Sequence, residues 1–391
     1  MEDFTRLDAL LERFAKNTVP CCGCAIMRGD EILFETYKGY ANLEEKIPLN
    51  RNHMFRQAST TKLFTYTIMG MLFEEGKLLF SDPIGEYLPE WKNTTKYVRR
   101  ENGDFEVVPA KRPITVKDAA SMSCGLPYCM FPDENAKIPT LADMSRRIGK
   151  LLEEKKVPTL RDEVRVMADV PLMFDPGTHW FYGFGSEIIG ALVETIEGKP
   201  LRRVFEDRLI RPLGLKNTDT YCTDENKDRV LGNYEKLPDG TLRPFPAGNN
   251  SDVNPDISPE GARPNLLSSP ADFATFMQML ANGGTWKGER FLGKGTVEMM
   301  TANCLNAAQL EDFSDAYLNG YGYGLGFRTL IDKAKGSHNG NLGAFGWTGG
   351  GGTWAEADPV RRVSLVYMHN MFPNEELYHH HRFRNVAYGC L

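Results

Sequence analysis

Three segments in the middle of the chain carry apolar residues at helical spacing, and each stops at a glycine. They are residues 62–75, 186–197 and 270–282. The first is apolar on almost every face, which predicts a buried helix. The third follows Ser269-Pro270, where serine is a good N-cap and proline suits the first helical position. A hairpin is predicted over residues 98–108, and the rest of this middle region is predicted to be mostly helical.

Both ends of the chain are instead typical of β-strands, apart from an amphipathic helix predicted over residues 1–15. Two short β-prone runs are separated by Arg28-Gly29-Asp30, which is a hairpin signal because glycine tolerates the positive φ of tight turns. Three further strand candidates lie near the other end, and a polar, helical tail follows them. The runs are residues 22–27, 32–37, 323–330, 353–357 and 363–368.

Strands at the two ends need partners, and the simplest arrangement is a single sheet built from both. We therefore predict an α+β fold in which an antiparallel sheet is flanked by helices. Residues 1–57 and 320–391 are expected to form this sheet domain, and residues 58–319 an inserted, mostly helical domain.

The composition excludes several classes of protein. The 391 residues are 41% hydrophobic, 25% charged and 11% aromatic, which disfavours disordered, collagen-like and small disulfide-bonded proteins. With 46 basic and 52 acidic residues the formal net charge is -6, the wrong sign for a nucleic-acid partner. No apolar run approaches the roughly 18 residues that span a bilayer, so we expect a soluble protein without a membrane partner. The oligomeric state is not predicted.

The cysteines and the N-terminus favour a cytoplasmic location. The first residues lack the basic start and apolar centre of a signal peptide. The adjacent Cys21 and Cys22 cannot readily pair with each other, which fits a reducing compartment. We expect buried thiols rather than a metal site, because alternate side chains of a strand face opposite ways. The eight cysteines are at positions 21, 22, 24, 124, 129, 222, 304 and 390.

No metal or cofactor is expected elsewhere either. The three histidines at 379–381 are predicted to lie on the surface. His338 and His369 have no convincing aspartate partner in the sequence, and no Gly-x-Ser-x-Gly motif is present. A Ser-His-Asp triad of the α/β-hydrolase kind therefore has little support.

The candidate chemistry begins at Ser59 and Lys62, which open the buried helix three residues apart. This spacing puts a hydroxyl and an amine on one helix face. A desolvated lysine can take the proton of a serine, and a helix N-terminus stabilises the negative charge that develops there. Ser-x-x-Lys occurs by chance about once in a chain of this size, so a capping serine followed by a surface lysine is the alternative.

The context of this motif resembles the serine β-lactamase-like family, which includes class C β-lactamases, DD-peptidases and family VIII carboxylesterases. Similar landmarks extend along nearly the whole chain. They lie at residues 55–62, 74–78, 82–83, 114–116, 122–127, 175–177, 212–215 and 266–272. The resemblance implies a β-lactamase/transpeptidase-like fold with Ser59 as nucleophile and Lys62 as its proton acceptor.

The second element of this family is a Tyr-x-Asn triplet, which Tyr182-Gly183-Phe184 resembles. A phenol beside an ammonium has a lowered pKa, so the resemblance implies that Tyr182 shares proton transfer with Lys62. The alternative is an aromatic cluster that packs the interface between domains. Phe184 replaces the asparagine, so the amide that binds an acylamino group is missing.

The third element is Lys-Thr-Gly, which resembles Trp347-Thr348-Gly349 here. Tryptophan in place of the lysine is a feature of the carboxylesterase branch. The resemblance implies an oxyanion hole formed by the backbone amides of Ser59 and Gly350. An ordinary glycine-rich turn is the alternative. The substrate is expected to contact Phe184, Trp347, Thr348 and Gly349, with the two aromatic rings forming a wall.

These features predict a serine hydrolase that works through a covalent acyl-enzyme. A carboxylesterase for small or apolar esters is favoured, with acyl transfer to an alcohol as a related activity. The enzymatic alternative is a β-lactamase or D-amino-acid peptidase acting on an amide. The alternative of another class is a non-catalytic binding domain that keeps the fold.

Overall fold

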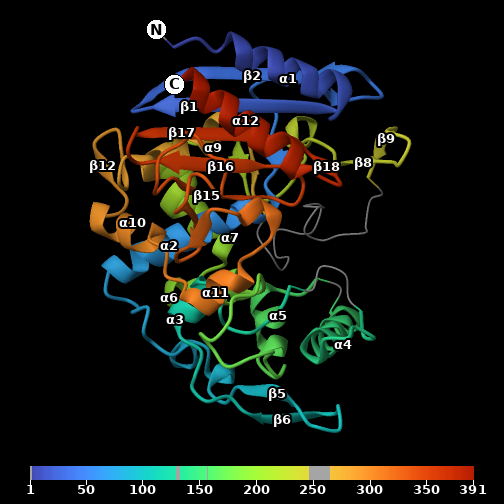
Figure 1. Ribbon diagram of the computed structural model, residues 1–391, viewed down its shortest axis with the longest axis vertical. Helices are drawn as coiled ribbons and strands as arrows, with labels where there is room; N and C mark the ends of the chain where they lie inside the picture. The colour runs from blue at the N-terminus through green and yellow to red at the C-terminus, as the bar shows by residue number, and fades with distance from the viewer. Residues whose placement is uncertain (1, 129–132, 156, 246–264) are drawn as a thin grey trace.

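A computed structural model describes residues 2–128, 133–155, 157–245 and 265–391 of the chain. Eight strands of these residues form one antiparallel sheet in the order β13-β14-β15-β16-β17-β1-β2-β3 (Figure 1). All eight come from residues 21–48 and 321–368. They are β1 (Cys21–Arg28), β2 (Glu31–Asn42), β3 (Ile47–Pro48), β13 (Tyr321–Tyr323), β14 (Arg328–Leu330), β15 (Phe345–Thr348), β16 (Trp354–Asp358) and β17 (Val363–Met368).

Helices cover both faces of this sheet. On one face α1 (Thr5–Asn17) packs against α12 (Glu376–Cys390), so the two ends of the chain lie close together (Figure 1). On the other face α9 (Pro270–Ala281) packs against β1, β16 and β17. The sheet is therefore the middle of three layers, and the predicted class of fold is confirmed.

The cysteines of β1 show that this strand contributes side chains to the cores on both faces of the sheet. Cys22 and Cys24 belong to the core under α1 and α12, whereas Cys21 belongs to the core under α9. Burial raises the pKa of the Cys21 thiol to about 12, so this thiol is unreactive. The described cysteines form no disulfide with one another, and Cys129 lies outside the described residues.

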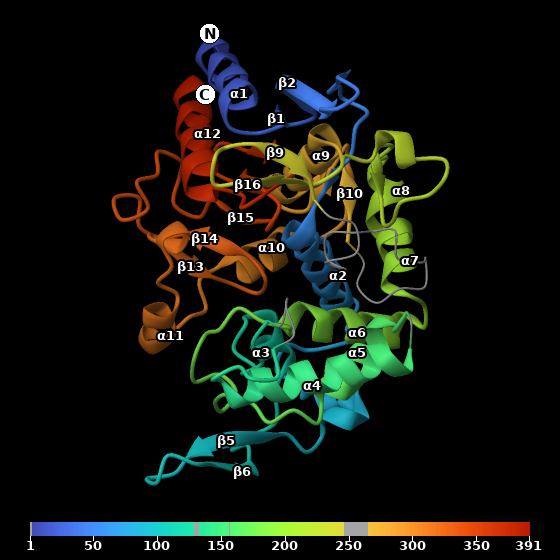
Figure 2. The ribbon, with the colours of Figure 1, turned by 90° about the vertical axis from the view of Figure 1, so that its right-hand side faces the viewer.

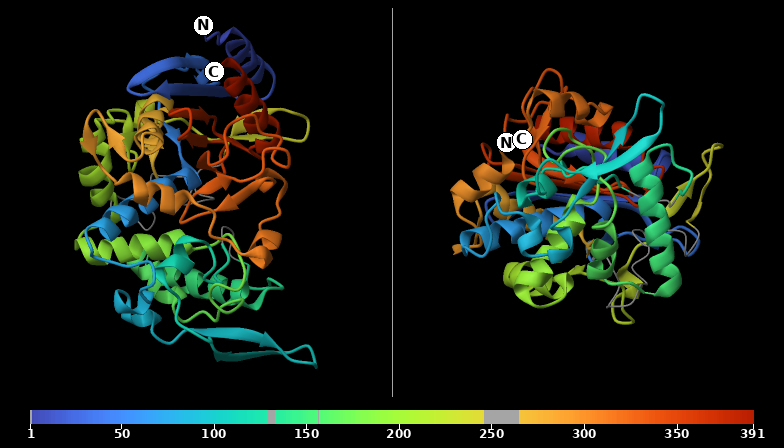
Figure 3. Two further views of the ribbon diagram at one scale, coloured as in Figure 1. Left: turned by 60° about the vertical axis from the view of Figure 1, so that its left-hand side comes forward. Right: turned by 90° about the horizontal axis from the view of Figure 1, so that it is seen from below.

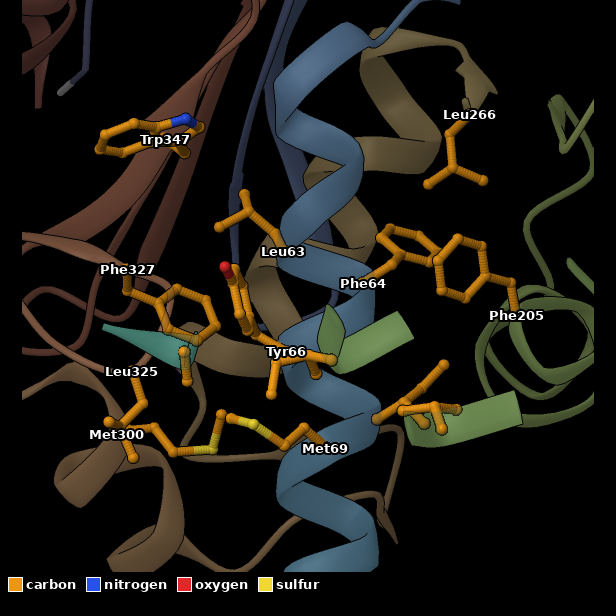
Figure 4. Close-up of a cluster of buried hydrophobic side chains, with 14 of the residues drawn as sticks. Leu63, Phe64, Tyr66, Met69, Phe205, Leu266, Met300, Leu325, Phe327 and Trp347 are labelled. Carbon is orange, nitrogen blue, oxygen red and sulfur yellow. The ribbon is translucent and has the colours of Figure 1, made fainter. Parts of the chain in front are cut away.

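The helix α2 (Lys62–Glu74) lies between the sheet layers and a second group of helices (Figure 2). It is buried on every side, because its residues are apolar almost all round. Figure 4 shows Phe64 directed toward Phe205 and Leu266, while Tyr66 lies on the opposite side, near Phe327. The remaining helices are α3 (Val116–Ala120), α4 (Pro139–Glu154), α5 (Leu160–Met167), α6 (Gly185–Glu197), α7 (Leu201–Phe205), α8 (Arg211–Leu213), α10 (Lys294–Thr301) and α11 (Ala307–Asp312).

Short strands complete the described structure. The predicted hairpin around residues 98–108 is confirmed as β5–β6, which projects from the end of the molecule opposite the sheet (Figure 3). The short strands are β4 (Phe55–Arg56), β5 (Thr95–Arg99), β6 (Phe105–Pro109), β7 (Thr218–Asp219), β8 (Tyr234–Lys236), β9 (Leu242–Pro244), β10 (Leu267–Ser268), β11 (Thr285–Trp286), β12 (Glu289–Arg290) and β18 (Met371–Phe372). Within the described ranges, no helix is both long and apolar enough to cross a bilayer.

Two predictions were wrong. The single strand over residues 323–330 is two strands, β13 and β14, because Gly326 adopts a φ of +92° in a tight turn between them. The histidines at 379–381 were expected on the surface, but His379 and His380 are buried. The helix α12 packs against both α1 and the sheet, so its buried face is wide enough to hold two consecutive residues.

Candidate active site

Ser59 lies in a 3-10 turn, Ala58–Thr61, that joins β4 to α2. Ala58 directly before it has a φ of +47°, a strained value for a residue other than glycine. The buried Gln57 side chain supports this turn, because its amide donates to the carbonyls of Phe55 at 3.0 Å and Ser268 at 3.1 Å. The sharp turn leaves the Ser59 side chain half-buried at the start of α2.

Lys62 is the first residue of α2, and its side chain turns back toward Ser59. Its Nζ donates to the Ser59 Oγ at 3.4 Å, so the structure brings the predicted pair together. Lys62 is only 8% exposed, which differs from the alternative of a surface lysine. A buried amino group beside a hydroxyl is an arrangement that can activate the oxygen as a nucleophile.

Tyr182 is held by close packing between two loops. The backbone of Gly183 lies against Leu126, where a Cβ on Gly183 would come within 1.7 Å of the Leu126 carbonyl oxygen. The Tyr128 N–H donates to the Tyr182 carbonyl at 3.3 Å. Only glycine permits this approach, and it places the rings of Tyr128 and Tyr182 side by side, with centroids 5.7 Å apart.

The Lys62 amino group lies among aromatic rings and one carboxylate. Its Nζ is 5.0 Å from the ring centroid of Tyr128 and 5.6 Å from that of Tyr182. The Oε1 of Glu187, in the first turn of α6, is 3.9 Å from the same nitrogen. Sequence reasoning missed Tyr128 and Glu187, although an acidic residue in an otherwise apolar helical turn was a usable signal.

Trp347 contacts Tyr182 directly. Its indole N–H donates to the Tyr182 hydroxyl oxygen at 3.3 Å, and the two rings stack with centroids 5.4 Å apart. The expected aromatic wall differs in detail, because Phe184 is 0% exposed and stacks behind Tyr128. Trp347 is itself only 2% exposed. The two rings thus support the tyrosines rather than line an open surface.

The glycine-rich segment after β15 is fastened to the turn that carries Ser59. The Thr353 hydroxyl donates to the Gln57 carbonyl at 2.9 Å and lies 3.3 Å from the Thr60 hydroxyl. Gly349 N–H donates to the Thr353 carbonyl at 2.8 Å, and Thr348 before it is buried. The Gly350 N–H, by contrast, has no acceptor within the described part of the chain.

Buried histidines support this glycine-rich segment from below. His380 Nε2 lies 3.1 Å from the carbonyl oxygen of Gly352, and the His369 ring packs against the same glycine. Burial lowers the pKa of His380 to about 3, and it lowers that of His369 well below its usual value. Both rings are therefore neutral at ordinary pH.

The other candidates do not join the site. His338 accepts the Gly340 N–H at Nδ1 (2.8 Å), so its Nε2–H faces Glu356 at 3.1 Å and neither nitrogen faces a serine. In the described ranges, no cluster of three or more histidine, cysteine or acidic side chains could hold a metal ion. What the structure assembles is a hydroxyl, an amine and a phenol beside a glycine-rich turn, an arrangement suited to acyl transfer.

Comparison with known proteins agrees with this geometry. The family model described as Beta-lactamase matches residues 7–388. Protein Rv1367c of Mycobacterium tuberculosis is 28% identical over 84% of this chain and 80% of its own length. A protein of Escherichia coli K12, named as a candidate D-alanyl-D-alanine carboxypeptidase, is 23% identical over 95% of this chain and 82% of its own. The solved structure of EstCE1, described as a hydrolase with promiscuous acyltransferase activity, superposes with a TM-score of 0.77 and 22% identity over 98% of both chains.

Proposed function

Since the chain belongs to the β-lactamase family and is a serine hydrolase of the β-lactamase and penicillin-binding-protein type, we propose that it is a carboxylesterase for small, uncharged esters. Ser59 attacks the ester carbonyl, and the pair formed by Lys62 and Tyr182 serves as the general base for its proton. The Ser59 and Gly350 amides stabilise the tetrahedral oxyanion, where one such donor is worth about 100 to 1000-fold in turnover. Water, or an alcohol in acyl transfer, then releases the acyl group from Ser59.

The observation that carries this proposal is the place of Trp347. In the Lys-Thr-Gly motif a lysine stands at this position, and here an indole fills it with its N–H engaged by Tyr182. The guanidinium of Arg328 lies 5.8 Å from the centre of the Trp347 ring, but Arg328 is only 3% exposed and donates to the Tyr317 carbonyl.

Among the described residues, a substrate carboxylate therefore finds no cation in the place of that lysine. A charge-assisted hydrogen bond is worth roughly 1.5 to 3 kcal/mol, so its loss costs about 10 to 150-fold in kcat/KM. Penicillins, cephalosporins and D-Ala-D-Ala peptides all carry such a carboxylate. Short neutral esters do not, and they are the substrates that this site suits best.

The test compares kcat/KM for p-nitrophenyl acetate and butyrate with that for a chromogenic cephalosporin and a D-Ala-D-Ala peptide. We expect both esters to be turned over faster than either anionic substrate. A cephalosporin or peptide that exceeds every ester would show a β-lactamase or peptidase instead. No turnover of any of them would favour a binding domain.

The nucleophile is tested separately by mass spectrometry. A fluorophosphonate should add one phosphonyl group, and peptide mapping should place it on Ser59. Ser59→Ala should abolish both labelling and esterase activity, whereas Ser81→Ala, at an exposed serine, should keep both. A label on another residue, or full activity of Ser59→Ala, contradicts the mechanism.

A further inference from the structure

Glu187 is a buried acid whose position is fixed by its surroundings. It is 8% exposed, and its Oε2 accepts the Ser186 hydroxyl at 2.6 Å while its Oε1 accepts that of Tyr128 at 3.5 Å. The same Oε1 lies 3.9 Å from the Lys62 Nζ. Burying a carboxylate is costly unless it is paired, and Lys62 is the cation beside it.

We propose that Glu187 is a positioning residue that keeps Lys62 an ammonium at the nucleophile, so that the Ser59 proton passes to Tyr182. This inference rests on the proposed serine hydrolase. The contact at Ser59 is compatible with it, because the Lys62 Nζ lies 3.4 Å from the Ser59 Oγ, where an ammonium can donate to that oxygen. Ser186 and Tyr128 hold the carboxylate in place, and neither bond supplies a positive charge.

The group that takes the Ser59 proton must first have given up one of its own, and Lys62 and Tyr182 are the two candidates at this site. Glu187 stabilises the positive charge of a protonated Lys62 amine, and the Trp347 N–H stabilises negative charge on the Tyr182 phenol oxygen. The missing proton is therefore that of Tyr182. Glu187 and Trp347 therefore stabilise the same state, in which Lys62 is an ammonium and Tyr182 a phenolate.

The Ser59 hydroxyl gives its proton to the Tyr182 phenolate as Oγ bonds to the ester carbon, and the carbonyl electron pair moves onto its oxygen. When this intermediate collapses, the ester C–O bond breaks and the departing alkoxide takes the proton from Tyr182. Lys62 keeps its three protons throughout.

The test is the pH profile of kcat/KM for p-nitrophenyl acetate in Glu187→Gln. Without the carboxylate the pair loses its proton more readily, so the acid limb should move to lower pH by about 1 to 3 units. The plateau should fall at least 10-fold, because the proton is now missing from the amine. Glu187→Asp keeps the negative charge, so the acid limb of its pH profile should stay at the wild-type pH.

Two other outcomes overturn the proposal. A lower plateau with an unmoved acid limb would mean that Glu187 is merely structural. A moved limb with an unchanged or higher plateau would mean that neutral Lys62 is the base and that Glu187 restrains it. Glu194→Gln is the matched control, because Glu194 is a partly buried acid of the same helix that accepts the Leu201 N–H. It should change neither limb nor plateau.

A second pair of variants keeps the inference testable if Glu187→Gln folds poorly. Arginine stays charged at every working pH, so Lys62→Arg should retain at least 10 times the activity of Lys62→Ala. Equal loss in both variants contradicts a cationic role. Failure of the proposed function is distinguishable, because it would show as wild-type protein that neither turns over esters nor labels at Ser59.

Discussion

Replacing Trp347 by phenylalanine tests whether its indole acts through Tyr182. The change deletes the N–H that meets the Tyr182 oxygen at 3.3 Å, while an aromatic ring remains to stack on the tyrosine. A neutral hydrogen bond contributes about 0.5 to 1.5 kcal/mol, which corresponds to roughly 2 to 13-fold in kcat. A bond to an oxygen that carries negative charge contributes about 1.5 to 3 kcal/mol, or roughly 10 to 150-fold.

The size of the loss therefore reports the charge on Tyr182 during the reaction. We expect kcat for p-nitrophenyl acetate to fall by more than about 13-fold with little change in KM, because the bond matters most when the phenol oxygen is negative. Trp180→Phe is the matched control. Trp180 packs 6.4 Å from the Tyr182 ring, but its indole nitrogen has no hydrogen-bond partner among the described residues.

A double-mutant cycle completes this test. If Trp347 acts through the Tyr182 hydroxyl, Trp347→Phe should have no further effect once Tyr182→Phe has removed that hydroxyl. Equal loss from Trp180→Phe, or a full loss from Trp347→Phe in the Tyr182→Phe background, would refute the reasoning. Both results would show that the indole supports the site by packing alone.

Three further predictions concern the groups around the nucleophile. Thr353→Val deletes the hydroxyl that fastens the glycine-rich segment to Gln57. The free energy of unfolding in urea should fall by about 1 kcal/mol, and kcat should fall as well. An unchanged kcat would exclude a role of this bond in the oxyanion hole. Lys62→Ala, Tyr182→Phe and their combination should lower kcat by similar factors, and multiplying effects would show that the two act independently. His380 has a pKa of about 3 in the folded protein and about 6.5 in the unfolded chain. Between these values only the unfolded chain takes up the proton, so the free energy of unfolding at pH 5 should be lower by up to about 2 kcal/mol. His380→Gln can still donate to Gly352 but cannot titrate, and an equally steep loss between pH 6.5 and 5 in this variant would contradict the assignment.

Local sequence patterns were sufficient to predict most of the main helices and strands. The strand alternation of Cys21, Cys22 and Cys24, and the glycine that ends α6 in a left-handed conformation, follow from short-range rules. The Ser59–Lys62 contact is similarly local, because a single helical turn brings the two side chains together. Such features depend on neighbours within a few residues.

The rest of the site depends on contacts between distant segments. Nothing near Glu187 in the sequence indicates that Lys62 lies beside it, and nothing near Trp347 indicates that its N–H meets Tyr182. The burial of His380 likewise depends on α12 being covered by α1 from the other end of the chain. Periodicity within one segment carries no information about which other segment will cover it.

A sheet built from both chain ends also means that parts of the site are synthesised far apart in time. The inner edge of β1 pairs with β17, so the first strand made during synthesis waits for residues 363–368 before it has this partner. Ser59 emerges early, whereas Trp347 and Gly350 follow only after most of the chain has been made. Closing so long a loop is slow compared with local helix formation. A nascent chain stalled before β15 therefore holds Ser59, Lys62 and Tyr182 without Trp347 and Gly350.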